Sequence, residues 1–181
     1  MKKLFVCIGD GGSGKTTLIA ELIRRHPDQF KRVVTCTSRP MRAGEVHGID
    51  YHFLPEKYFI GNPDLVLATR TVEGWYYGTR KSELFSTSHH LLLTSKLTGV
   101  SLLTSLGCRN IIVVRMSISN QLKVERMRQR GDTEEIISHR LKEDDGDNGS
   151  SVDMGHIPII DLQADQTIEE KIGHLLRHAN T

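Results

Sequence analysis

The amino-acid sequence predicts an α/β fold, in which a mostly parallel β-sheet carries helices on both of its faces. Short apolar runs alternate with amphipathic helical segments along the chain, as they do where each strand is followed by a crossover helix. The chain has 181 residues, which is about one domain and enough to enclose one hydrophobic core.

Strands and helices are expected in a regular order. The apolar runs that predict strands lie at residues 4–8, 33–36, 65–68, 91–93, 111–114 and 157–162. Helical spacing of apolar residues occurs at 16–26, at 119–144 with a break at Gly131 and Asp132, and after Thr167, the expected N-cap of a last helix. The acidic stretch at 144–155 predicts a flexible loop, because it lacks the ligand spacing of a calcium-binding loop.

The composition argues against a nucleic-acid binder, so any phosphate ligand is expected to be a small molecule. Lysine and arginine total 24 against 22 aspartates and glutamates, so the net charge is +2, and no run of like charges forms a basic stripe. The apolar run at 4–8 is too short for a signal sequence, and no segment approaches a membrane span. We therefore expect a cytoplasmic protein with no nucleic-acid and no membrane partner, and the oligomeric state stays open.

Cysteine usage agrees with a reducing compartment. Cys7, Cys36 and Cys108 are scattered and never form a CxxC pair. Cys7 and Cys36 fall in apolar runs that predict strands, so they are expected to be small buried residues.

Residues 9–16, GDGGSGKT, match the pattern GxxxxGK[ST] between an apolar strand and an amphipathic helix. Glycines let successive backbone N–H groups turn toward a phosphate, and the helix N-terminus adds its positive dipole end. Lys15 is expected on the β- and γ-phosphates of ATP, and the Thr16 hydroxyl on Mg²⁺. The residues expected to bind the nucleotide are Gly9, Gly11, Gly12, Ser13, Gly14, Lys15, Thr16 and Thr17. This loop predicts a sheet of the P-loop NTPase type.

A second pattern points to a phosphorylated acceptor. In residues 35–53, Arg39 and Arg42 flank a proline among hydroxyl residues, and Tyr51 follows. Guanidinium groups suit bidentate binding of phosphate oxygens, and a phenol can donate a further hydrogen bond. For such an arginine pair alone, two exposed surface arginines would be the simpler interpretation.

Four segments together favour the acceptor site, because they resemble the guanylate kinase family and follow its order: the P-loop, residues 35–53, residues 76–79 and residues 126–140. The resemblance spans most of residues 4–142. It implies a single domain over 1–181, with a core at 1–34, 86–125 and 143–181. It also implies a small acceptor-binding subdomain at 35–85 and a lid at 126–142.

The resemblance also implies roles for individual residues. The acceptor phosphate would be bound by Arg39, Arg42, Tyr51 and Tyr77, with Thr35 and Thr79 near the base. The transferring phosphoryl group would be approached by Lys15 and, on lid closure, by Arg128, Arg130 and Arg140. Positive charge and positioning are what phosphoryl transfer requires of a protein.

The sequence departs from the family where a base would be recognised. Counting back from Gly78, Ala68 occupies the place of the acidic residue that contacts guanine. The family's acidic pair after a core strand corresponds to residues 93–96, with Thr94 and Lys96 in the acidic places. Glu73 lies nearby in the sequence, on the expected turn.

We therefore predict an ATP- and Mg²⁺-dependent kinase that transfers the γ-phosphoryl group to a nucleoside monophosphate. Two alternatives stay open. One is a kinase for another small phosphorylated acceptor, such as ribose 1,5-bisphosphate. The other is a non-catalytic guanylate-kinase-like binding module, against which the intact Gly14, Lys15 and Thr16 argue.

Overall fold

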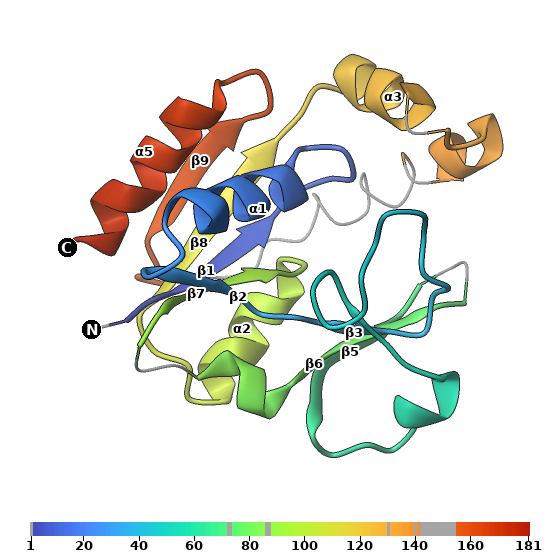
Figure 1. Cartoon of the computed structure of the whole chain (residues 1–181), viewed down its shortest axis with the longest axis horizontal. Helices are drawn as coiled ribbons and strands as arrows, with labels where there is room; N and C mark the ends of the chain where they lie inside the picture. Colours follow the sequence, from blue (N-terminus) through green and yellow to red (C-terminus); the bar gives the residue numbers. More distant parts are fainter. Residues whose placement is uncertain (1, 72–73, 86–87, 130, 140, 142–154) are drawn as a thin grey trace.

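The computed structural model describes residues 2–71, 74–85, 88–129, 131–139, 141 and 155–181 (Figure 1). Its main feature is a five-stranded sheet of strand order β2-β7-β1-β8-β9, in which every neighbouring pair runs parallel. Helices cover both faces of this sheet, so the predicted fold class is confirmed.

Apart from residues 30–32 and 98–105, the elements of this layer lie where the sequence predicts them. The strands are β1 (Leu4–Ile8), β2 (Phe30–Arg32), β7 (His90–Thr94), β8 (Ile111–Ser117) and β9 (Ile159–Gln163). The helices are α1 (Lys15–Arg25), α2 (Thr98–Ser105), α3 (Asn120–Gln129) and α5 (Ile168–Ala179), and residues 134–139 are also helical. Thr167 caps α5 in a capping box with Glu170, as predicted.

The side-chain alternation of β1 divides the core into two layers. Phe5 and Cys7 point to the face that α1 and α5 cover, and Val6 points to the face that α2 covers. Every residue of β1 is buried. This central strand therefore holds the start of the glycine loop rigidly in the sheet.

A second, four-stranded sheet has the order β4-β3-β6-β5. Its strands are β3 (Cys36–Thr37), β4 (His52–Phe53), β5 (Leu65–Arg70) and β6 (Tyr76–Arg80), accompanied by the 3₁₀ turns η1 (Glu56–Tyr58) and η2 (Lys81–Leu84). In Figure 1 this sheet lies below α3 and residues 134–139, to the right of the main sheet. The division into core, acceptor-binding and lid parts stays a prediction.

Several elements differ from expectation. Strands β2, β4 and β6 were not predicted. No strand forms at 33–35, because the chain leaves the main sheet after Arg32 and enters the second sheet at Cys36. The apolar character of this link reflects burial, since Val33 is only 2% exposed. Helix α2 was not anticipated, and its residues Thr98 and Gly99 have low helix propensity.

The cysteine prediction is confirmed, since all three are buried and unpaired. The flexible loop predicted at 144–155 lies outside the described residues except for Gly155. Among the helices that the structure describes, none is long and apolar enough to cross a membrane.

Candidate active site

The glycine loop joins the end of β1 to the start of α1, and its backbone requires glycine. A Cβ atom on Gly9 would lie 2.2 Å from the carbonyl oxygen of Met116 in β8. Gly12 and Gly14 have φ angles of 82° and 95°, in the left-handed region that other residues rarely adopt. The sequence therefore allows a tight loop whose backbone a phosphate can approach closely, and it fits the nucleotide phosphates that the pattern predicts.

Helix α1 presents its N-terminus to this loop. Gly14 is the N-cap and provides no side chain, and the first turn contains no acidic residue. The first N–H groups and the positive end of the helix dipole are therefore available to an anion. The Lys15 ammonium donates to the Gly9 carbonyl at 2.6 Å, to the Asp10 carbonyl at 2.8 Å and to the Ser13 hydroxyl at 3.3 Å.

A cleft of about 480 Å³ opens beside the loop. Thr16 and Thr17, both exposed, contribute to its wall. The cleft is lined by Gly12, Gly14, Lys15, Thr16, Thr17, Arg126, Ala164, Gln166, Ile168 and Lys171. The cleft therefore extends from the glycine loop, also called the phosphate loop, to the turn between β9 and α5. Its size suits the nucleoside part of a nucleotide.

Two cations of this cleft were absent from the predicted site residues. Arg126 donates to the Gly12 carbonyl at 2.9 Å and to the Ala164 carbonyl at 3.3 Å. Lys171 donates to the Ala164 carbonyl at 3.1 Å, and burial lowers the pKa of Lys171. The arginine-rich run at 126–131 gave a signal for Arg126, but only the fold distinguishes the arginine that points to the loop.

The second sheet brings the predicted acceptor residues together. β3 and β6 are antiparallel, with Thr37 opposite Tyr77. The rings of Tyr51 and Tyr77 lie 6.0 Å apart between centroids. The Arg39 guanidinium carbon lies 5.6 Å from the Tyr51 ring centroid. One guanidinium and two phenols from three separate segments thus meet on one face of this sheet.

Glu45 controls the charge of this cluster. Its carboxylate accepts from the Arg39 guanidinium at 2.7 and 3.0 Å and from the Arg42 backbone N–H at 2.7 Å. Burial works to lower the pKa of Arg39, but hydrogen bonds with Glu45 and Tyr77 outweigh it, and the pKa is raised. Arg39 is therefore a permanent cation, 8% exposed and held in a fixed orientation.

The other acceptor residues lie around this cluster. Arg42 is exposed on the loop. Thr79 is 2% exposed and shares a face of β6 with Tyr77, two positions earlier. Thr35 is half-buried, and its carbonyl accepts from the His52 N–H at 2.8 Å.

The predicted lid arginines are placed differently from one another. Arg128 is exposed on α3 and binds Glu134 at 2.6 and 3.1 Å, which links α3 to the helical residues 134–139. Arg126, two residues earlier, faces the phosphate loop instead. Arg130 and Arg140 lie outside the described residues.

The structure also shows where the positions lie that carry no acidic residue although the family resemblance predicts one. Ala68 is exposed on β5, and its Cβ lies 3.7 Å from the position of a Cβ on Gly78. Thr94 pairs with Cys7 at the end of β7, and the Ser95 N–H donates to the Cys7 carbonyl at 3.1 Å. The segment that ends at Lys96 therefore starts beside the phosphate loop. Glu73 is outside the described residues.

Parallel β-strands, a glycine loop before α1 and a helix N-terminus without a side-chain cap define a protein of the P-loop NTPase fold. The sequence model of guanylate kinases matches residues 1–154. The chain belongs to the guanylate kinase family.

Individual relatives agree. The guanylate kinase of Chlamydia abortus is 32% identical over 153 residues, covering 78% of this chain and 74% of that protein. The guanylate kinase of Chlamydia trachomatis serovar D is 44% identical over 84 residues, but the match spans only 45% of this chain and 41% of that protein. The crystal structure of guanylate kinase from Anaplasma phagocytophilum has a TM-score of 0.62 at 17% identity, covering 97% of this chain and 82% of that chain, and so supports the fold.

Proposed function

We propose that this protein transfers the γ-phosphoryl group of ATP to a small phosphorylated acceptor, in the first instance a nucleoside monophosphate. The observation that carries the proposal is the presence of two separate anion-binding devices on two sheets. One is the glycine loop with Lys15, and the other is the cluster of Arg39, Tyr51 and Tyr77. The guanylate kinases among the relatives support the same reaction class.

The loop is proposed to bind the triphosphate. Bound Mg²⁺-ATP supplies the transferable phosphoryl group. Lys15 exchanges its bonds to loop oxygens for phosphate oxygens, and the exposed Thr16 hydroxyl is available to Mg²⁺. Arg126 and Gln166 line the adjoining cleft and are proposed to contact the nucleoside part.

The acceptor cluster is proposed to bind the phosphate that receives the group. Arg39 is held by Glu45 so that its remaining N–H groups and the two phenols can face an anion. Arg42 is proposed to add a second guanidinium, and Thr35 and Thr79 to lie near the base. Holding donor and acceptor phosphates in one orientation is the main task of a phosphotransferase.

The lid is proposed to complete the site. Arg128, Arg130 and Arg140 are proposed to approach the transferring group, which requires Arg128 to leave Glu134. Closure would also exclude water, which otherwise diverts ATP into hydrolysis. The protein is proposed to work in the cytoplasm.

Guanine selectivity is proposed to be weak. Guanine presents two donors, N1–H and the exocyclic amino group, so a selective buried site needs acceptors opposite them. Ala68 offers no polar side-chain atom, and Lys96 offers donors only. This feature favours either a relaxed nucleoside monophosphate kinase or a kinase for another phosphate, such as ribose 1,5-bisphosphate.

The deciding experiment measures ADP release from Mg²⁺-ATP against all ribo- and deoxyribonucleoside monophosphates and ribose 1,5-bisphosphate. Acceptor-dependent ADP release supports phosphoryl transfer, and the best acceptor identifies the substrate. Binding of nucleotides without ADP release with any acceptor would replace the proposal by the non-catalytic binding module. A preference for GMP or dGMP of more than about a thousandfold over every other acceptor would contradict weak guanine selectivity. Such a preference exceeds the effect of leaving one buried guanine donor without a partner.

A further inference from the structure

Lys123 of α3 is almost completely buried, with 1% of its side chain exposed. Its ammonium lies 3.1 Å from the carboxylate of Asp10, the second residue of the glycine loop. A lysine charge is almost never fully buried unless it is paired, because desolvating an ammonium is costly. The Asp10 carboxylate therefore explains how the fold accommodates the buried Lys123 charge.

The neighbours of Lys123 on α3 contact the same loop. Arg126, three residues later, donates to the Gly12 carbonyl at 2.9 Å. Met127, four residues later, packs so closely on Gly11 that a Cβ there would lie 3.2 Å from the methionine methyl. Because residues at i, i+3 and i+4 share one face of a helix, α3 rests on the loop along this face.

The position of Asp10 makes this pair relevant to phosphate binding. A carboxylate in a loop that binds a triphosphate repels the ligand, since both carry negative charge at short range. A buried ammonium at 3.1 Å offsets that repulsion. It also restrains the Asp10 side chain on the α3 side of the loop.

We propose that Lys123 is a positioning residue of the phosphate loop, which neutralises Asp10 and holds α3 against the loop so that a polyphosphate binds tightly. The inference rests on the proposed function, since it takes the loop as the ATP site. The proposal gives α3, which leads into the proposed lid, a role in nucleotide affinity. The contact responsible, between Lys123 and Asp10, was not implied by the family resemblance.

A double-mutant cycle of Asp10 and Lys123 tests the proposal. The measured quantity is the affinity for two probes, Mg²⁺-ATP and inorganic tripolyphosphate. Lys123→Met removes the buried cation that pairs with the Asp10 carboxylate and is expected to weaken binding of both probes by about tenfold or more. Asp10→Asn removes the repulsive charge but keeps a side-chain oxygen that can accept from the Lys123 ammonium, and it is expected to bind within about threefold of the wild type. The double variant Asp10→Asn/Lys123→Met is expected to recover that affinity, which a purely structural role of Lys123 would not produce.

The control is Lys31→Met, which removes an exposed lysine of β2 and should leave affinity unchanged. If Lys123→Met does not fold, recovery of folding and binding in the double variant supports the proposal equally. Unchanged affinity in Lys123→Met, no recovery in the double variant, or a tenfold loss in Asp10→Asn overturns it. Wild-type protein that binds tripolyphosphate but not ATP would contradict the proposed function and leave this test intact; binding of neither probe overturns both.

Discussion

The two halves of the proposed site are built in opposite ways. The phosphate loop is one continuous segment of six residues between β1 and α1, and its donors are backbone N–H groups and Lys15. The acceptor cluster collects Arg39, Tyr51 and Tyr77 from separate segments of a second sheet and depends on side chains. A backbone site tolerates little variation, whereas a side-chain site can change its ligand by single substitutions.

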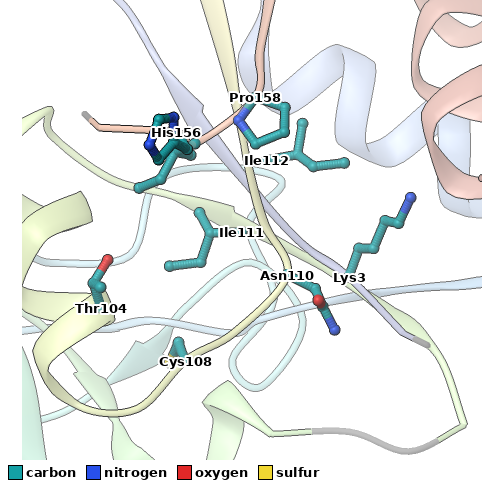
Figure 2. Close-up of a pocket in the computed structure, with 9 residues that line it drawn as sticks. Lys3, Thr104, Cys108, Asn110, Ile111, Ile112, His156 and Pro158 are labelled. Carbon is teal, nitrogen blue, oxygen red and sulfur yellow. The ribbon is translucent and has the colours of Figure 1, made fainter.

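A second cavity lies away from both halves of the proposed site. It measures about 450 Å³ and lies at the amino ends of the strands, where residues before β1, β8 and β9 converge (Figure 2). Lys3, Asn110 and Pro158 are among the side chains around it, and no glycine loop or guanidinium cluster adjoins it within the residues that the structure describes. Both proposed phosphate sites belong to other parts of the molecule.

The largest expected effect removes the cation of the loop. Lys15→Ala should lower kcat by about a hundredfold to a thousandfold, because the charge that stabilises the transferring phosphoryl group is lost. Far-UV circular dichroism and Tm should stay close to those of the wild type, and Lys57→Ala, an exposed lysine of η1, serves as control. Full activity in Lys15→Ala would break the assignment of the loop.

The next effect isolates the acceptor half. Arg39→Ala should reduce kcat/KM for the acceptor by about a hundredfold and leave the affinity for ATP nearly unchanged, because the acceptor phosphate loses a buried cationic donor. Arg42→Ala should act in the same direction. Initial rates at varied ATP and acceptor separate the two constants.

A matched control exists on the same sheet. Arg80 donates to the Tyr58 hydroxyl at 3.2 Å, within a tyrosine–arginine pair that the proposed acceptor site does not use. Arg80→Ala should leave the acceptor KM unchanged. Equal losses for ATP and acceptor in Arg39→Ala would show that the two halves are not separate sites.

The same contrast explains what the sequence could predict. The loop is local, so its pattern together with the apolar run before it and the helical spacing after it was sufficient to predict β1 and α1. Arg126 and Lys123 were not identified as contacts of the loop, because their distances to it depend on how α3 packs. For the acceptor residues, the resemblance supplied roles, and the structure adds the pairing of Arg39 with Glu45, which no residue pattern specified.

Ala68→Glu sharpens the comparison by testing whether one side chain resets the acceptor half. Ala68 is exposed, which leaves room for a longer side chain. A carboxylate there can accept from both guanine donors, and the expected gain in preference for GMP over other monophosphates is about tenfold to a hundredfold. Ala68→Gln has the same length but carries an amide, and should gain less. Equal preference in both variants would argue against recognition of guanine at this position.

The smallest expected effect concerns acid stability of the acceptor half. Burial works to raise the pKa of Glu45, but the hydrogen bonds from Arg39 and the Arg42 backbone N–H outweigh it, and the pKa is lowered. A carboxyl group with a lowered pKa in the folded state contributes its full stability above its unfolded pKa, about 4.3, and loses it as the pH falls through the folded value. Glu45→Gln should therefore flatten the fall of Tm below about pH 4.5.

The fluorescence of the single tryptophan can report on the acceptor half separately from the rest of the protein. Trp75 precedes β6 in the acceptor half, and its backbone N–H donates to the Thr71 hydroxyl at 3.2 Å. Because Glu45 lies in the acceptor half, Trp75 fluorescence should change at a higher pH than far-UV circular dichroism in the wild type. In Glu45→Gln, which carries no carboxyl group to protonate, the two transitions should move closer together. Coincident transitions in the wild type would mean that both halves unfold as one unit, and that the Glu45 ion pair adds no separate acid sensitivity to the acceptor site.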